Sequence, residues 1–242
     1  MTGAGTRERV RRAILDTRLV VVARRLDTRN AVPVARELVR AGVPALEITF
    51  ENPSCREIVL AIRDDLGDAV LLGAGTVTSP DRYALARELD VDFVVSPVFD
   101  PAVVQDCIES RRFVIPGALT PSEVHRAWSS GADMVKVFPV EGIAHNYVGA
   151  LREPFGEPIL MGTGGVRLER VGQFLDAGLD VFGVGGGILD SDAIREAEYA
   201  VVGEKARQYS AAIRTHLEHL RTSAHPATAR IAAYMNGTRK KG

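Results

Sequence analysis

Cysteine, lysine and long apolar runs are all scarce in this sequence of 242 residues. The two cysteines, Cys55 and Cys107, lie far apart and have no CxxC or Cys/His spacing, which argues against a disulfide scaffold or a structural zinc site. No apolar run approaches the roughly 20 residues that span a bilayer, and the polar, arginine-rich start lacks the apolar core of a signal peptide. We therefore expect a cytoplasmic protein that has no membrane partner.

An excess of either charge is absent too, since 30 Lys and Arg residues face 31 Asp and Glu residues for a net charge of -1. No broad cationic surface follows from this balance, so we expect no nucleic-acid partner. Among the histidines, only His145 has a metal-like spacing, at i+4 from Glu141, and two residues do not make a metal site. We interpret them as a surface pair and predict neither a metal nor a cofactor.

Eight short apolar or β-branched segments recur along the chain, and segments with helical periodicity separate them. Apolar strands that alternate with helices are typical of a parallel sheet that is buried on both faces. Eight equivalent units favour a closed (β/α)8 barrel over an open doubly wound sheet, because no chain reversal or second composition interrupts them. The predicted strands are residues 19–23, 45–49, 70–75, 92–97, 113–117, 134–139, 158–165 and 180–187.

We predict one barrel domain, residues 1–221, which begins with a helix and ends with a closing helix over 203–221. Residues 222–242 combine a proline break, small residues and a basic end, and we expect this extension either to pack on a neighbouring subunit or to fray. Within the barrel, three helix starts are marked by a capping side chain that precedes a proline, at Ser79-Pro80, Asp100-Pro101 and Thr120-Pro121.

Lys136 is the only lysine of the predicted barrel strands, because Lys205, Lys240 and Lys241 all follow the eighth strand. It lies between two valines, where burial would lower the pKa of its ammonium group and leave a free amine to attack a ketone. This environment is typical of a lysine that forms a Schiff base. Two other placements remain open from the pattern alone: a salt bridge inside the barrel, or an outward orientation between helices.

Glu47 lies on an otherwise apolar predicted strand, so we expect its carboxylate to point into the barrel. There it could carry protons beside Lys136 for a reaction that needs a general acid and base. It could also form a core salt bridge with Arg24 or Lys136, and the two interpretations can coexist.

Two glycine-rich turns follow neighbouring predicted strands, GTGG at 162–165 and GVGGG at 183–187. Glycines let backbone N–H groups approach an anion, and barrels commonly hold phosphate in the loops after strands seven and eight. The turns therefore predict a phosphate cradle. The alternative is that these glycines only permit tight turns between strand and helix.

Taken together, these residues resemble the family of 2-keto-3-deoxy-6-phosphogluconate (KDPG) and 4-hydroxy-2-oxoglutarate (KHG) aldolases over about residues 14–200. The motifs follow one another in the order and spacing of that family. They are LEITFENP (46–53), GAGTVTSPDR (73–82), FVVSPVFDP (93–101), VIPGALTPSEV (114–124), MVKVFPVE (134–141) and GTGGV (162–166).

The resemblance implies a class I aldolase on a (β/α)8 barrel that assembles as a homotrimer. It would reversibly cleave a 2-keto-3-deoxy or 4-hydroxy-2-keto acid, such as 2-keto-3-deoxy-6-phosphogluconate, to pyruvate and an aldehyde. It implies that Lys136 forms the Schiff base and that Glu47 is the general acid and base. The implied substrate-binding residues are Arg24, Thr76, Pro97, Phe138 and Thr163, and the implied phosphate site is Gly164, Gly165, Gly185 and Gly186.

Two departures from the family pattern leave the substrate open. Glu51 stands where many members carry an arginine that helps to hold the anionic substrate, and Gly186 stands where members often carry a serine. We also consider a phosphate-binding isomerase or epimerase with Glu47 as its base and Lys136 as an electrostatic group. A third interpretation is a barrel without catalysis that binds a metabolite or a protein.

Overall fold

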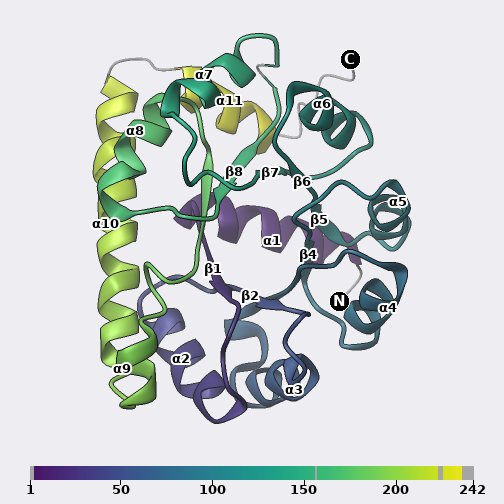
Figure 1. Cartoon of the computed structure of the whole chain (residues 1–242), viewed down its shortest axis with the longest axis vertical. Coiled ribbons are helices and arrows are strands. Elements are labelled where there is room, and N and C mark those ends of the chain that lie inside the picture. The colour runs from purple at the N-terminus through teal and green to yellow at the C-terminus, as the bar shows by residue number, and fades with distance from the viewer. Residues whose placement is uncertain (1–2, 156, 223–225, 236–242) are drawn as a thin grey trace.

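Parallel strands line the centre of the molecule and helices surround them (Figure 1). The structure is a computed structural model that describes residues 3–155, 157–222 and 226–235. In this part of the chain the strands are Leu19–Ala23 (β1), Ala45–Thr49 (β2), Leu71–Gly75 (β3), Phe93–Val95 (β4), Phe113–Ile115 (β5), Gly117–Ala118 (β6), Val135–Val137 (β7), Leu160–Thr163 (β8) and Val181–Val184 (β9). Each predicted strand segment contains at least one of them.

The sheet closes into a barrel through residues 113–118. Its strand order is β5-β4-β3-β2-β1-β9-β8-β7-β6, so the two strands at its edges, β5 and β6, are consecutive in the chain and only Pro116 separates them. β5 pairs with β4 and β6 pairs with β7. The predicted (β/α)8 barrel is confirmed, but the single strand predicted over 113–117 is wrong. Pro116 has no N–H for a strand ladder, and its carbonyl accepts the Lys136 N–H at 2.8 Å.

Helices cover the outside of the strands and one end of the barrel (Figure 1). The described helices are Gly3–Thr17 (α1), Thr28–Arg40 (α2), Cys55–Leu66 (α3), Pro80–Glu88 (α4), Pro101–Glu109 (α5), Pro121–Ser129 (α6), His145–Arg152 (α7), Val171–Asp176 (α8), Ser191–Arg195 (α9), Ala200–Thr222 (α10) and Pro226–Met235 (α11), with short 3-10 turns at Gly67–Ala69 (η1) and Leu168–Arg170 (η2). None of these helices combines the length and apolar character needed to cross a bilayer.

The three proline-marked helix starts are confirmed. Ser79, Asp100 and Thr120 are the N-caps of α4, α5 and α6, and each side chain accepts a hydrogen bond from a backbone N–H of the first turn. Thr120 forms a complete capping box with Glu123.

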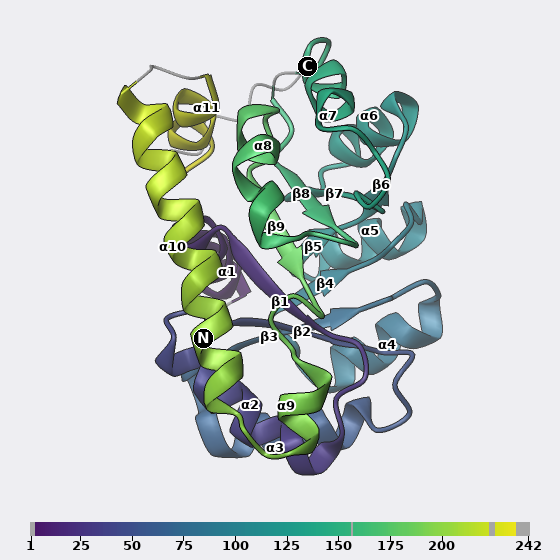
Figure 2. The same ribbon diagram turned by 60° about the vertical axis from the view of Figure 1, so that its left-hand side comes forward.

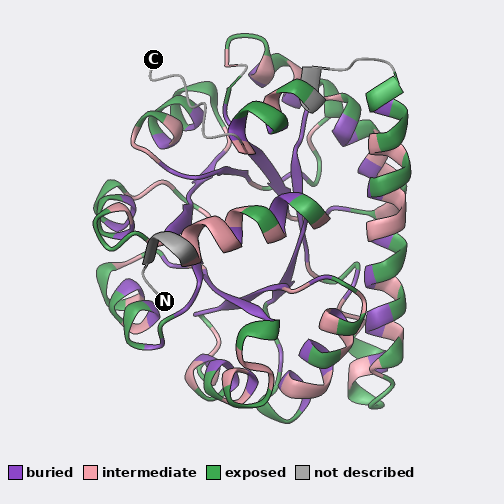
Figure 3. Ribbon diagram, turned by 180° about the vertical axis from the view of Figure 1, so that it is seen from behind, coloured by how far each residue is buried: buried purple, intermediate pink, exposed green. Residues whose placement is uncertain are grey.

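The apolar core has two parts. One lies between the strands and the surrounding helices, and the other fills the barrel with residues such as Phe93, Phe113 and Met161. Val10 and Ile14 of α1 join this inner part, and α1 crosses the back of the barrel (Figure 3). The end of the barrel at which the strands begin is therefore closed, and chemistry is left to the opposite end.

Buried aspartates just before three strands tie the barrel together at its closed end. Asp92, Asp133 and Asp180 precede β4, β7 and β9, and each accepts the backbone N–H of a residue in the preceding part of the sheet, at 2.9 Å in every case. Arginines pair with each of these carboxylates from outside the barrel. A buried carboxylate with such partners holds the strand register and the surrounding helices together.

The predicted C-terminal extension contains α11, which packs against α1 and α10 of the same chain. Arg230 pairs with Asp180 at 2.7 Å, and the Tyr234 hydroxyl donates to the Asp133 carbonyl at 2.6 Å. Figure 2 shows α11 and α9 at opposite ends of α10. Residues 223–225 and 236–242 of the extension lie outside the described residues.

Candidate active site

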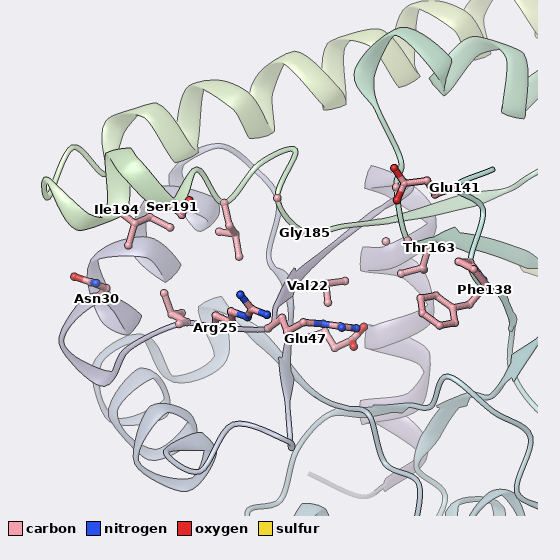
Figure 4. Close-up of a pocket in the computed structure, with 18 of the residues that line it drawn as sticks. Val22, Arg25, Asn30, Glu47, Phe138, Glu141, Thr163, Gly185, Ser191 and Ile194 are labelled. Carbon is pink, nitrogen blue, oxygen red and sulfur yellow. The ribbon is translucent and has the colours of Figure 1, made fainter.

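A cavity of about 770 Å³ opens at the end of the barrel where the strands finish. Such a volume lies within the range of pockets that enclose small-molecule ligands. In Figure 4, Phe138 and Thr163 lie on one side of it, Glu47 and Val22 near its centre, and Ser191 and Ile194 on the far side. The cavity therefore runs from the barrel mouth toward the gap between α2 and α9.

Lys136 comes from the centre of β7, and its side chain lines this cavity although only 4% of the residue is exposed. Its Nζ lies 5.0 Å from the centre of the Phe138 ring. Within the described part of the chain, no carboxylate lies within 4.0 Å of Lys136 Nζ, so the alternative of a barrel salt bridge is wrong. The outward orientation is wrong as well.

Glu47 comes from β2 and lines the same cavity with 1% of the residue exposed. Its Oε2 atom is buried and has no hydrogen-bond partner among the described residues. Gly75 of the neighbouring β3 makes room for the carboxylate, because a Cβ at Gly75 would meet Glu47 Oε1 at 2.1 Å. An unsatisfied buried carboxyl oxygen is costly to the fold and is typical of a group reserved for a ligand or a proton transfer.

Burial shifts the protonation of both side chains toward their neutral forms. It is the largest influence on Lys136, whose pKa it lowers, and the nearby Glu47 charge opposes this only in part. Burial likewise raises the pKa of Glu47, against the opposing charges of Lys136 and then Arg24. Burial thus favours the uncharged amine of Lys136 and the protonated form of Glu47, two forms that suit attack on a carbonyl and proton transfer.

Thr163 ends β8 with a buried hydroxyl whose Oγ1 has no partner among the described residues. Gly183 of β9 leaves the space for it, since a Cβ there would meet this oxygen at 2.4 Å. The hydroxyl lines the cavity with Lys136 and Glu47. It is a free hydrogen-bonding group for a polar ligand.

The glycine-rich turns line the next part of the cavity. Gly164 and Gly165 have φ of +84° and +79°, a backbone conformation that side chains with a Cβ rarely adopt. Neither the Gly165 nor the Gly186 backbone N–H donates a hydrogen bond to another described residue. Gly185 and Gly186 line the same cavity from the turn after β9. The turns thus leave donors free for an anion, as well as permitting a tight connection.

Arg24 lies at the cavity after β1, with 56% of its side chain exposed. Its Nε atom is 3.5 Å from Oε1 of Glu51. The charge of Arg24 is therefore partly balanced before any substrate binds.

Two expected substrate-binding residues, Thr76 and Pro97, are not among the residues that line the cavity. Thr76 follows β3 with a φ of 57°, and its carbonyl accepts a hydrogen bond from Arg82. The backbone of Pro97 packs on Gly117, where a Cβ would approach it to 2.2 Å. Phe138, by contrast, lines the cavity.

The structure adds cavity residues that the sequence interpretation missed. They come from the loop after β1, the start of α2, the segment after β7 and the segment around α9; the polar ones are Arg25, Asp27, Arg29, Asn30, Glu141, Ser191 and Arg195. The position of α9, a short helix after the last barrel strand, is the signal that could have found some of them. Glu141 and His145 are both exposed, as expected for a surface pair, but α7 begins only at His145, so the two residues do not lie on one helix.

Residues 10–205 match the model of the family described as KDPG and KHG aldolase, and this stretch includes every strand of the barrel. The chain belongs to the KDPG and KHG aldolase family. The resemblance derived from the motifs is thereby confirmed. Among the described residues, no group of three or more His, Cys, Asp or Glu side chains is placed to hold a metal ion.

Similar proteins carry KDPG and KHG aldolase names. The chain is 36% identical to the 2-dehydro-3-deoxy-phosphogluconate aldolase of Treponema pallidum (strain Nichols) over 147 residues, 60% of this chain and 70% of that one. It is 31% identical to the KHG/KDPG aldolase of Escherichia coli (strain K12) over 193 residues, 78% and 88% of the two chains. A solved structure described as native KDPGal matches with a TM-score of 0.76 and 25% identity, covering 83% and 96%. The chain is therefore an aldolase, which is a lyase.

Proposed function

We propose that this member of the KDPG and KHG aldolase family works through a Schiff base on Lys136. The observation that carries the proposal is the buried amine of Lys136, which has no carboxylate within 4.0 Å among the described residues and shares its cavity with Glu47. An uncharged amine can attack a ketone, whereas an ammonium locked in an ion pair cannot.

In the proposed reaction the Lys136 amine adds to the C2 carbonyl of a 2-keto acid and forms a carbinolamine. The Glu47 acid protonates the carbinolamine hydroxyl, which leaves as water and produces an iminium ion. The Glu47 carboxylate then accepts the proton of the C4 hydroxyl. The C3–C4 bond breaks, an aldehyde departs, and the bonding electrons form an enamine on the nitrogen. Protonation at C3 and hydrolysis of the imine release pyruvate and the free amine.

Borohydride trapping tests this proposal directly. We expect reduction in the presence of pyruvate to add a stable adduct to the chain, and peptide mass spectrometry should place it on Lys136. Lys205, which pairs with Asp190 at 2.6 Å, is the internal comparison and should stay unmodified. Absence of an adduct, or retained turnover in Lys136→Arg, would contradict the mechanism and favour an isomerase in which the lysine supplies only charge.

We further propose 2-keto-3-deoxy-6-phosphogluconate as the substrate, with pyruvate and glyceraldehyde 3-phosphate as products. The free N–H groups of Gly165 and Gly186 support a phosphate in the glycine-rich turns. Arg24 would help to hold the substrate carboxylate, and Thr163 would bond to the same group. The similar proteins have names that divide among related keto acids, so turnover of each acid is the measurement that decides.

The variant Gly186→Ser probes the phosphate directly. A Cβ at Gly186 meets no atom within 4 Å, so the hydroxyl fits without displacing a neighbour. We expect this variant to raise kcat/KM several-fold for the phosphorylated acid and to leave an unphosphorylated acid unchanged, because a hydroxyl adds one donor to the phosphate. Equal effects on both acids would contradict a phosphate at this turn.

We also propose that the chain assembles as a homotrimer in the cytoplasm. The family resemblance supports the homotrimer, and the expectation of a cytoplasmic protein comes from the composition of the sequence. Light scattering coupled to size-exclusion chromatography measures the assembly, and a monomeric mass would contradict it.

A further inference from the structure

The cavity continues past the glycine-rich turns into the gap between α2 and α9. Figure 4 shows Arg25, Asn30, Ser191 and Ile194 on this side, away from Phe138 and Thr163. A substrate whose keto carbon lies at Lys136 would direct its far end into this region. We call it the distal region of the cavity.

Several arginines line the cavity in or near the distal region, and they differ in whether a carboxylate already pairs with them. Arg29 lies 3.9 Å from Asp27, and Arg195 lies 2.8 Å from Asp192. Arg24, nearer the barrel mouth, faces Glu51. Arg25 also lines the cavity, but no carboxylate of the described residues lies within 4.0 Å of it, and its side chain forms no hydrogen bond with them.

The glycine-rich turns offer only backbone donors to an anion at this end. Gly186 has no side chain, and open space surrounds the position that its Cβ would take. Backbone N–H groups carry partial charges, and they balance a full negative charge less well than a guanidinium does. A charged group bound here would gain from a nearby cation that no carboxylate already neutralises, and Arg25 is such a cation.

We propose that Arg25 is a specificity-determining residue that binds the distal anionic group of the substrate. The ligand chemistry is a phosphate or a carboxylate at the far end of a 2-keto acid, opposite the carbon that reacts with Lys136. Arg25 then selects substrates with a charged distal group over substrates of the same length whose distal group is uncharged. This inference rests on the proposed Schiff-base aldolase function, and it extends that function to the choice of substrate.

Three variants and three substrates test it. Arg25→Met removes the charge and keeps a long side chain, and Arg25→Lys keeps the charge but loses the planar donor fork. Arg87→Met, at an exposed arginine of α4 outside the cavity, is the matched control. The substrates are 2-keto-3-deoxy-6-phosphogluconate, with a distal phosphate, 4-hydroxy-2-oxoglutarate, with a distal carboxylate, and 2-keto-3-deoxygluconate, with a distal hydroxyl.

We expect Arg25→Met to lower kcat/KM about tenfold or more for one or both charged acids, which is the loss expected for a hydrogen bond to a charged group. For 2-keto-3-deoxygluconate, whose distal group is an uncharged hydroxyl, we expect a change within about twofold. Arg25→Lys should retain part of the lost efficiency, and Arg87→Met should match the wild type on every substrate. The charged acid that loses more identifies the distal group as phosphate or carboxylate.

The assignment of Arg25 would be overturned if Arg25→Met lowered kcat/KM equally for acids with charged and uncharged distal groups. It would also be overturned if kcat/KM fell for neither acid with a charged distal group. Borohydride trapping with pyruvate separates this result from failure of the aldolase mechanism, because pyruvate has no distal group to reach Arg25. We expect Arg25→Met to form the Lys136 adduct as the wild type does. A wild type without the adduct would overturn the mechanism, and the role of Arg25 with it.

Discussion

Lys136 lies at the centre of the buried strand β7, where its ammonium group would lose most of its hydration. The ring of Phe138 lies with its centre 5.0 Å from Lys136 Nζ, and a ring cannot replace a carboxylate as a counter-charge. The same burial that keeps the amine reactive therefore weakens the folded state. Function and stability oppose each other at this residue.

We expect Lys136→Met to abolish turnover and pyruvate trapping. We also expect the free energy of unfolding of this variant to be about 1–2 kcal/mol higher than that of the wild type at neutral pH. The folded wild type has a lowered Lys136 pKa, so between that pKa and the unfolded value near 10.5 the unfolded chain binds the extra proton. Wild-type stability due to this group therefore rises with pH across that window, and the variant should lose this slope. Urea unfolding at several pH values measures both effects, and a less stable variant would contradict the argument.

Gly75 controls the position of the Glu47 carboxylate through the space it leaves. We expect Gly75→Ala to lower kcat about a hundredfold or more, because its Cβ would meet Glu47 Oε1 at 2.1 Å and displace the general acid and base. Gly149→Ala is the control, since a Cβ at that helical glycine meets nothing within 4 Å. Steady-state kinetics with a keto-acid substrate distinguish them; equal rates in the two variants would show that Glu47 tolerates the displacement.

Among the elements, the starts of β4, β7 and β9 share one device, a buried aspartate that accepts a strand N–H. Asp133 accepts a hydrogen bond from the Val114 N–H at 2.9 Å and pairs with Arg7 at 2.7 Å. Its removal would leave the buried N–H of Val114 and the guanidinium of Arg7 without this partner. We expect Asp133→Ala to cost about 3–5 kcal/mol of stability. Glu204→Ala, which breaks the exposed pair with Arg207, should cost less than about 1 kcal/mol. Thermal or urea unfolding that gives similar losses for both would contradict this role of the aspartate.

The alternation of apolar strands and periodic helices was sufficient to predict the barrel, and proline-marked caps located three helix starts. The break at Pro116 was missed because an apolar segment with one proline still resembles a single strand. No capping residue marks the start of α7 in the sequence, because its N-cap, Ala144, makes no side-chain capping bond. The position of Lys136 and Glu47 at the barrel mouth followed from the strand pattern. Arg25 and the residues around α9 did not, because side chains in loops follow no period.

At the scale of the whole molecule, the two ends of the barrel perform separate tasks. The end at which the strands finish holds the cavity with its unpaired polar groups. The other end is closed by α1 and α11, and its buried aspartates are paired with arginines. The first arrangement costs stability, and the second supplies it.

Removal of residues 223–242 tests this division, because it takes away α11 and leaves the cavity residues in place. The truncated chain loses the Arg230–Asp180 pair and the Tyr234 hydrogen bond to Asp133, and it exposes apolar residues of α1 that Ile231 and Tyr234 help to cover. We expect the free energy of unfolding to fall by at least about 3 kcal/mol, since Asp180 loses Arg230 and keeps only Arg152 of these two ion-pair partners. Below its lowered melting temperature it should still form the borohydride adduct with pyruvate at the wild-type rate. If adduct formation fell while the chain remained folded by circular dichroism, α11 would contribute to the site and not only to the fold.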